Sequence, residues 1–319
     1  MWRLPVSVLA IFLLSCSDDG LPITFAGDIL LDRGIRRQID RSGIETLFSG
    51  VSDILHGSTF SVGNLECPLS NINNPQNKKY TFRGEPIWAK GLRKAGFTHL
   101  DVANNHTCDQ GAIGFAETME CIKSEGIGPI GATCAGKDQV LLASGSDTCA
   151  LFASNLVRPE PGEIVPDSVA PCRMGADDLS LIVRQYHSTH PKHFIIVLLH
   201  WGREHSESVN PEQRNVAHLL VDAGADIIVG HHPHVLQPIE IYNRKPIIYS
   251  LGNFVFDQAQ PSATRSMLAG LVIKKGRLTK VRIFPIVITN GIPTRIGNSD
   301  FIMPIIPQAD LGLFEVSKR

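Results

Sequence analysis

Five short apolar segments of this chain run directly into Asp, Glu, Asn or His, and this pattern restricts the fold more than any other. Short, continuous apolar runs are typical of strands buried on both faces, as in parallel sheets. The five junctions are Ile23–Gly27 before Asp28, Phe60–Gly63 before Asn64 and Glu66, Leu100–Ala103 before Asn104-Asn105-His106, Phe194–Leu199 before His200, and Ile227–Gly230 before His231-His232-Pro233-His234. Ligands of open α/β sheets bind beyond the carboxyl ends of the strands, so the pattern predicts one polar rim.

The residue types at this rim are those that hold a divalent transition metal: carboxylates, a carboxamide and imidazoles. A single histidine after a strand is more often a turn residue or a hydrogen-bonded core residue. His232 and His234 are a stronger signal, because alternate residues of an extended chain project to the same side. Five junctions together favour a metal centre over the structural alternative.

The rest of the chain reads as an α/β protein. Apolar residues at helical spacing predict a helix over Gly111–Glu125. Asn210 followed by Pro211 predicts the start of a second helix, which ends at Gly224. Met267–Lys274 and Leu278–Ile288 alternate as antiparallel strands do. Residues 155–175 are rich in proline and predict a long loop or lid. The remaining predicted strands are Ile23–Ala26, Thr59–Gly63, His99–Ala103, Phe194–Leu199, Asp226–Val229 and Pro246–Ser250.

The first fifteen residues have the pattern of an export signal. Arg3 precedes the apolar run Leu4–Leu14, which is too short to span a bilayer. The run ends at Ser15-Cys16, which resembles the lipobox of bacterial lipoproteins, so residues 1–15 are a predicted lipoprotein signal peptide and Cys16 the lipidated residue. Residues 16–21 then form a short tether, and residues 22–319 form a single domain. A soluble exported protein or an uncleaved anchor are the alternatives.

The other cysteines leave two possibilities open. Six remain, at positions 67, 108, 121, 134, 149 and 172, and none shows the CxxC spacing of a structural zinc site. In an oxidising compartment they could pair, in one of fifteen connectivities. Free buried thiols are equally compatible with a domain of this size.

The charge of the chain argues against nucleic acid as a partner. The sequence has 30 Lys and Arg against 31 Asp and Glu, for a formal net charge of -1. Binding to phosphate backbones needs a basic face, which this balance does not supply.

Several segments together resemble the CapA/PgsA family of bacterial envelope proteins, which are linked to poly-γ-glutamate capsule synthesis and are similar to calcineurin-type metallophosphoesterases. The segments are Gly27-Asp28-Ile29-Leu30, Asn64-Leu65-Glu66-Cys67-Pro68-Leu69, Lys79-Tyr80-Thr81-Phe82, Asn104-Asn105-His106, Leu199-His200-Trp201-Gly202, Gly230-His231-His232-Pro233-His234-Val235 and Ser250-Leu251-Gly252-Asn253-Phe254. The resemblance covers about residues 22–290 and implies a four-layer α/β/β/α sandwich.

The resemblance also implies roles for individual residues. Glu66 matches the carboxylate that bridges two metal ions, and His106 matches the catalytic histidine. One site would hold Asp28, Glu66 and His234, and the other would hold Glu66, Asn105, His200 and His232. The implied cofactor is one or two divalent ions of Mn, Fe or Zn.

Two positions depart from the phosphoesterase pattern, although both departures are shared with the CapA pattern. Leu30 stands where the Asp-x-His motif has its histidine, and Glu66 replaces an aspartate. The first site therefore loses a nitrogen ligand, and we expect one tightly held ion and a second that is weak.

Weaker candidates could contact substrate at the same rim. Asn64 and Asn253 border the predicted strand ends, although a polar loop role is equally compatible with Asn253. Lys79, Arg83 and Arg203 could contact an anion, but a solvated surface charge is the commoner role for such residues.

Two functions follow as hypotheses. The first is a metal-dependent hydrolase of the phosphoesterase type, with His106 as proton donor. The second is a non-catalytic capsule assembly or export accessory that uses the metal site to bind an anionic polymer or a membrane partner. In both cases we expect a lipid-anchored protein of the bacterial cell envelope, facing outside the cytoplasm, with capsule synthase or exporter proteins as possible partners.

Overall fold

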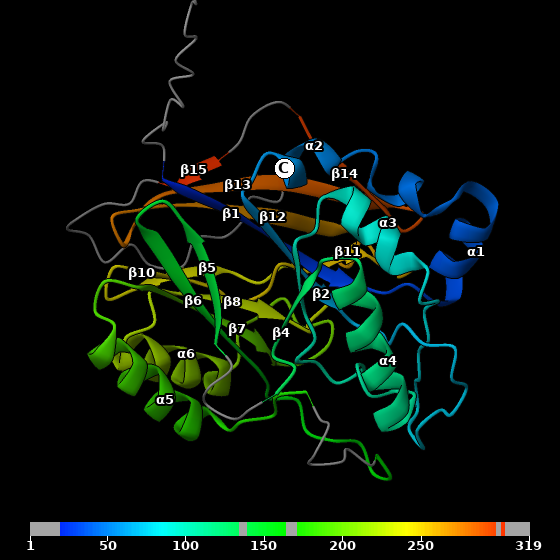
Figure 1. Ribbon diagram of the computed structural model, residues 1–319, viewed down its shortest axis with the longest axis horizontal. Coiled ribbons are helices and arrows are strands. Elements are labelled where there is room, and N and C mark those ends of the chain that lie inside the picture. The colour runs from blue at the N-terminus through cyan, green and yellow to red at the C-terminus, as the bar shows by residue number, and fades with distance from the viewer. Residues whose placement is uncertain (1–19, 134–138, 164–170, 298–300, 304–319) are drawn as a thin grey trace, which may run out of the picture.

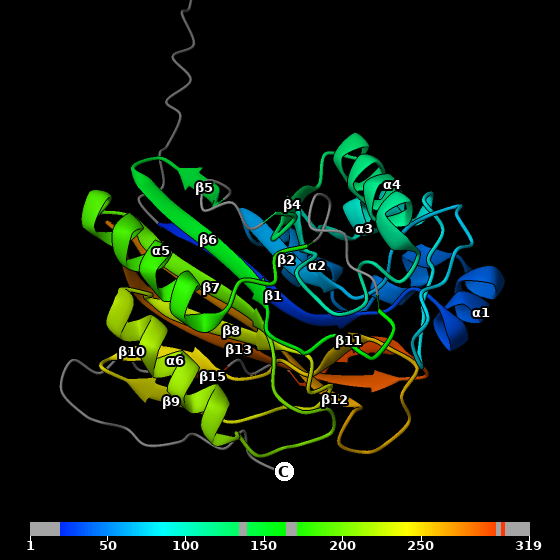
Figure 2. The same ribbon diagram turned by 90° about the horizontal axis from the view of Figure 1, so that it is seen from below.

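The computed structural model describes residues 20–133, 139–163, 171–297 and 301–303. In this part of the chain two β-sheets pack face to face, with helices outside them (Figures 1 and 2). The larger sheet has the order β14 (Ile292–Arg295), β13 (Arg277–Thr289), β12 (Arg265–Lys274), β1 (Leu21–Ile29), β2 (Phe60–Leu65), β3 (His99–Asp101) and β4 (Gly128–Ile130), with β11 (Asn253–Val255) paired to β1 and β15 (Phe301–Met303) paired to β13. The smaller sheet has the order β5 (Val140–Ser144), β6 (Asp147–Asn155), β7 (Phe194–His200), β8 (Ile227–His231), β10 (Lys245–Ile248) and β9 (Ile239–Tyr242).

Parallel strands form the centre of each sheet. β1 to β4 pair in parallel in the larger sheet, and β6, β7, β8 and β10 do so in the smaller one. The strands β12 and β13 are antiparallel, as their alternating sequence predicts. Because neighbouring parallel strands end at the same edge, the polar residues at the ends of β1 and β2 lie together, and so do those at the ends of β7 and β8.

The helices lie on the outer faces of the two sheets. Those that follow strands of the larger sheet are α1 (Arg33–Ser42), the 3-10 helix η1 (Ile44–Phe48), α2 (Ser52–His56), α3 (Trp88–Ala95) and α4 (Gly111–Ser124). Those on the smaller sheet are α5 (Ala176–Thr189) and α6 (Pro211–Ala223), which lie side by side in both views (Figures 1 and 2). The predicted helix starting at Pro211 is confirmed, with Asn210 and Gln213 forming a capping box and Gly224 as the left-handed C-cap.

Three apolar clusters separate the four layers. The first joins the larger sheet to its helices, with Phe48, Phe97 and Phe254 in ring contact. The second lies between the sheets and is lined by Phe25 and Phe194 among others. The third lies between the smaller sheet and helices α5 and α6. The predicted α/β/β/α sandwich is therefore confirmed, and it places strand ends from both sheets next to each other.

Some expectations fall partly or wholly outside the described residues. Residues 1–15 and Cys16 lie there, as does the central part, 164–170, of the predicted proline-rich loop 155–175. Asn155 is the last residue of β6, and residues 156–163 and 171–175 contain no helix or strand. Among the cysteines, Cys67, Cys108, Cys121 and Cys149 are free thiols, whereas Cys172 is disulfide-bonded. None of the helices in the described ranges combines the length and the apolar character that a membrane crossing needs.

Candidate metal centre

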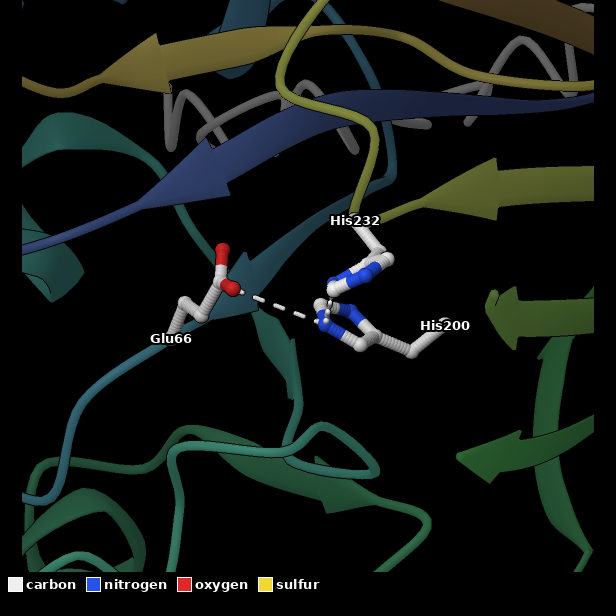
Figure 3. Close-up of side chains that lie close together, drawn as sticks. All are labelled: Glu66, His200 and His232. Atoms are coloured by element: carbon white, nitrogen blue, oxygen red, sulfur yellow. Dashed lines mark hydrogen bonds and ion pairs between the residues drawn. The ribbon is translucent and has the colours of Figure 1, made fainter. Parts of the chain in front are cut away.

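The candidate ligands come from strand ends of both sheets, whereas the sequence pattern alone predicted a single rim of one sheet. Asp28 lies in β1 and pairs in register with Asn64 of β2. His200 closes β7 and pairs with His231, which closes β8. The parallel strands of the two sheets point the same way at the site (Figure 3). Their carboxyl ends therefore form one rim, to which both sheets contribute. His200 is the last residue of its strand, and Asp28 and Asn64 are each the last but one, so all three lie within strands rather than after them.

Two glycines allow the ends of β1 and β8 to pack closely on the segment that joins β10 to β11. A Cβ atom on Gly27 would lie 2.0 Å from the carbonyl oxygen of Gly252, and one on Gly230 would lie 2.0 Å from that of Tyr249. Any other residue at these positions would push the backbone strands apart. The glycines that precede Asp28 and His231 therefore let both strand ends pack against the same segment, Tyr249–Gly252.

The turn after β8 is strained and directs its two histidines to different places. His232 has φ +93° and His234 has φ +59°, both in the left-handed region that residues with a side chain rarely adopt. The expected extended His-x-His geometry is thus wrong. The left-handed turn places the two ring centroids 6.0 Å apart, one in each of two groups of candidate ligands.

Glu66 lies at the centre of these two groups. Glu66, His200 and His232 form one group and Asp28, Glu66 and His234 the other, with the ligand atoms of each group within 4.8 Å of one another. Oε1 of Glu66 lies 3.5 Å from Nε2 of His200 and 3.8 Å from Nε2 of His234. Figure 3 shows its carboxylate directed at the facing rings of His200 and His232, whose Nε2 and Nδ1 atoms are 3.2 Å apart.

The carboxylate of Glu66 is buried without a hydrogen bond from the protein. Its side chain is fully buried, and neither oxygen has a hydrogen-bond partner. Burial raises the pKa of Glu66 well above its ordinary value, and the charge of His234 offsets only part of this effect. A buried carboxylate of this kind is costly unless a cation or a set of donors faces it.

The histidines differ in their electrostatic surroundings. Burial, together with the charge of neighbouring histidines, lowers the pKa of His200 well below its ordinary value and that of His232 to about 3. Both rings are therefore neutral and can offer a nitrogen lone pair to a cation. For His234, burial alone lowers the pKa, but the charges of Glu66 and Asp28 outweigh it and raise the pKa to about 9.

Asp28 belongs to the His234 side of the site. Its Oδ2 lies 3.1 Å from Nδ1 of His234, and its Oδ1 accepts a hydrogen bond of 2.8 Å from Nδ2 of Asn64. Burial alone would raise the pKa of Asp28, but His234 and Asn64 hold it below its ordinary value. Leu30, two residues on, is fully buried in the apolar cluster under the helices and offers no ligand.

Asn105 and His106 lie on the His200 side of the site, opposite Asp28. Oδ1 of Asn105 lies 2.8 Å from Nε2 of His200, so its side chain reaches the first group of ligands. His106 is buried, with its Nδ1 atom 2.8 Å from Oδ2 of Asp109 and its ring 4.4 Å from that of Phe82. All seven residues assigned to the centre from the sequence are thus brought to the same region of the fold.

The weaker candidates divide into two kinds. Asn64 and Asn253 are buried supports, because Asn64 bonds Asp28 and Asn253 accepts from Nδ1 of His234 at 3.0 Å. Of the three charged candidates, Lys79 is exposed with its Nζ over the ring of Tyr80, Arg83 pairs with Glu85 and the carbonyl of Ser70, and Arg203 is exposed. Within the described ranges, no hydrogen bond or ion pair joins these three to the candidate ligands.

Sequence reasoning missed three supporting residues. Asn104 donates to Oδ1 of Asn64 and accepts from the backbone of His106, so it links two strand ends. Asp109 bonds His106, and its i+3 spacing was an available signal. Lys78 lies 2.7 Å from Oδ1 of Asp109, and nothing in the sequence distinguishes it from the neighbouring Lys79.

The donor set fits a divalent cation. Two neutral imidazoles, an unpartnered buried carboxylate and a carboxamide oxygen surround one position, and carboxylates and a histidine surround another. Imidazole nitrogens suit Zn and Fe, and carboxylate and amide oxygens suit Mn, so this mixture of ligands does not select among Zn, Mn and Fe.

Comparison with known proteins places the chain in a family. A family model described as bacterial capsule synthesis protein PGA_cap matches residues 22–258. The chain belongs to this family. Among relatives of the PGA_cap family, the PGA biosynthesis protein CapA of Bacillus subtilis is 32% identical over 297 residues, which are 87% of this chain and 74% of the relative. The capsule biosynthesis protein CapA of Bacillus anthracis is 33% identical over 295 residues, which are 86% and 69% of the two chains.

Solved structures with a similar arrangement are more distant. The NAD nucleotidase NadN of Haemophilus influenzae has a TM-score of 0.46 and 12% identity, and covers 87% of this chain. The sulfate thiohydrolase SoxB of Thermus thermophilus has a TM-score of 0.48 and 12% identity, and covers 88% of this chain. This chain spans only 54% and 57% of the lengths of these two proteins, and likeness at this level carries no conclusion about its chemistry.

Proposed function

We propose that this member of the PGA_cap family is a metal-dependent hydrolase of the phosphoesterase type that acts in the synthesis of a poly-γ-glutamate-type capsule. Its relatives from two Bacillus species are named for capsule or PGA biosynthesis, which supports the capsule role. The export pattern of residues 1–15 and the position of Cys16 support a lipid-anchored protein of the cell envelope that faces outside the cytoplasm.

One observation carries the proposal: the fully buried carboxylate of Glu66, without a hydrogen-bond partner, between two groups of histidines and carboxylates. A purely structural core would replace such a carboxylate by an apolar residue at little cost. Glu66, Asn105, His200 and His232 would hold a divalent cation, and Asp28, Glu66 and His234 would hold a second one more weakly. Such a cation supplies positive charge that polarises an ester oxygen and makes water more acidic.

The protein residues would then hold and position the reactants. The carboxylate of Asp109 accepts from Nδ1 of His106, which leaves Nε2 of His106 to exchange a proton with a leaving group. The ring of Phe82 packs against His106 and limits both its rotation and the access of water. Asn104 holds the backbone of His106 through a 3.0 Å hydrogen bond, so that the turn stays in place.

The test is a substrate panel combined with one substitution. Purified protein supplied with Mn²⁺, Zn²⁺ or Fe²⁺ should hydrolyse an activated phosphodiester or monoester. The variant His106→Ala should keep its metal but lose at least 100-fold in kcat, in line with the usual contribution of a general acid. An absence of turnover with all three metals across mono- and diesters would refute the hydrolase.

A second function is favoured by one observation, the buried Leu30 at the place of a nitrogen ligand. A site with only one strongly held cation would suit the binding of an anionic polymer or of a capsule synthase or exporter partner without turnover. The two functions separate in cells. If the protein only binds, deletion of the gene abolishes surface polymer, while His106→Ala leaves it at the wild-type level. A His106→Ala strain that lacks polymer like the deletion strain would refute the binding role.

A further inference from the structure

Lys78 is a buried lysine whose ammonium group contacts Asp109 and Asn105, next to the candidate metal centre. Its side chain is 1% exposed, although it lies in the long loop between β2 and α3, in which the next residue, Lys79, is exposed. Lysine is almost never fully buried unless it is paired. Here the ammonium group lies 2.7 Å from Oδ1 of Asp109 and donates a 2.6 Å hydrogen bond to the backbone carbonyl of Asn105. Both partners belong to the loop between β3 and α4.

Asp109 is the link between Lys78 and His106. Its side chain is fully buried, and its Oδ2 accepts from the backbone N–H of Phe82 at 2.7 Å and lies 2.8 Å from Nδ1 of His106. A carboxylate has no proton to donate, so Nδ1 of His106 is the donor in this contact and Nε2 remains free. Lys78 balances the charge of this carboxylate from the other side, at Oδ1.

Asn105 is the second group that Lys78 holds. The carbonyl of Asn105 accepts from Lys78, while its side-chain Oδ1 lies 2.8 Å from Nε2 of His200. Asn105 is therefore fixed at its backbone by Lys78 and meets a candidate ligand with its side chain. Removal of the ammonium group would free both the ring of His106 and the backbone of Asn105.

We propose that Lys78 is a positioning residue of this centre, which fixes Asp109 and through it the ring of His106, and which holds Asn105 in reach of the metal. This inference rests on the proposed function for its kinetic consequence, but its geometric consequence is independent of turnover. Lys78 acts through Asp109 and Asn105 rather than by direct contact with the carboxylate and imidazole ligands.

The first measurement uses proton NMR on the full chain without metal. A ring proton on Nδ1 that is hydrogen-bonded to a buried carboxylate gives a resonance far downfield, and its loss in His106→Gln assigns it. We expect Lys78→Met to lose this resonance or to shift it upfield by at least 1 ppm. The control Lys94→Met removes an exposed lysine that pairs with Glu45 at 3.0 Å, and it should leave the resonance unchanged. An unchanged resonance in folded Lys78→Met would overturn the proposal.

The second measurement uses metal affinity and kinetics. Titration of Mn²⁺ into metal-free protein should show a dissociation constant about tenfold higher for Lys78→Met and unchanged for Lys94→Met. If the wild-type protein hydrolyses an activated phosphoester, Lys78→Met should lower kcat at least 30-fold while KM changes less than threefold. A kcat within threefold of wild type would overturn the positioning role. A wild-type protein without turnover would instead refute the hydrolase, and the resonance and the Mn²⁺ titration would still decide the role of Lys78.

Lys78→Arg covers the case in which Lys78→Met does not fold. It keeps the positive charge, although its planar head differs from an ammonium group. We expect it to retain the downfield resonance and at least a tenth of the wild-type kcat. Loss of the resonance in Lys78→Arg together with a wild-type kcat would show that activity does not depend on the contact between Asp109 and His106, and would overturn the positioning role.

Discussion

The variant Glu66→Gln should stabilise the metal-free protein and remove its response to metal. The substitution keeps the shape of the side chain and removes a fully buried charge whose oxygens have no hydrogen-bond partner. An unsatisfied buried polar group costs about 1–3 kcal/mol, and a charged one costs more. The new amide also lacks partners, so the net gain in free energy of unfolding should be about 1–3 kcal/mol.

These free energies translate into melting temperatures. For a chain of this length, 1 kcal/mol corresponds to roughly 2 °C, so metal-free Glu66→Gln should melt about 2–6 °C above the wild type. A cation at 100 times its dissociation constant stabilises the wild type by about 2.7 kcal/mol, or roughly 5 °C. The variant should gain less than about 1 °C, because it lacks the carboxylate shared by both groups of ligands.

Differential scanning calorimetry after treatment with a chelator, with and without Mn²⁺, measures both effects. Glu45→Gln is the matched control, since its exposed carboxylate pairs with Lys94 at the surface and its loss should change stability by no more than about 0.5 kcal/mol. A metal-free Glu66→Gln that melts below the wild type, or one that responds to Mn²⁺ as the wild type does, would refute this reasoning.

Three further predictions concern the scaffold. Asn64→Ala removes one buried hydrogen bond from Asp28 and one from Asn104, so urea titration should show a loss of about 2–4 kcal/mol, and a loss below about 0.5 kcal/mol would contradict the role of this side chain as a link. Burial lowers the pKa of His99 to about 4, so its contribution to stability is complete above pH 6.5 and declines as the pH falls towards 4. Between pH 7 and pH 4.5, the free energy of unfolding should therefore fall further in the wild type than in His99→Gln, by about 1–2 kcal/mol. An equal fall in the two proteins would contradict this role of His99. Asn210→Ala removes the N-cap of α6 and should cost about 1 kcal/mol in the same titration, with no effect on Mn²⁺ affinity.

The candidate ligands could be predicted from the sequence because each lies at or just after the end of a continuous apolar run. Asp28, Glu66 and His200 are of this kind, and local sequence alone reveals such junctions. Helix α6 was also predictable, since Asn210 and Gly224 are local signals of its two ends.

Other features depend on contacts between distant parts of the chain. Two sheets rather than one supply the rim, and only the tertiary packing of β1 on β8 creates it. The left-handed conformations of His232 and His234 are imposed by the surrounding structure against the preference of their side chains. Lys78 and Lys79 are neighbours of the same type, and a partner 31 residues away, Asp109, determines which of them is buried.

The central claim is that the buried carboxylate of Glu66 and the histidines around it hold a divalent cation. The most direct measurement is elemental analysis of the protein purified in the presence of Mn²⁺, Zn²⁺ and Fe²⁺ and then dialysed exhaustively. We predict one equivalent of a divalent transition metal per chain for the wild type and less than a tenth of an equivalent for Glu66→Ala. A wild-type protein without metal, or a Glu66→Ala variant that keeps a full equivalent, would contradict the claim.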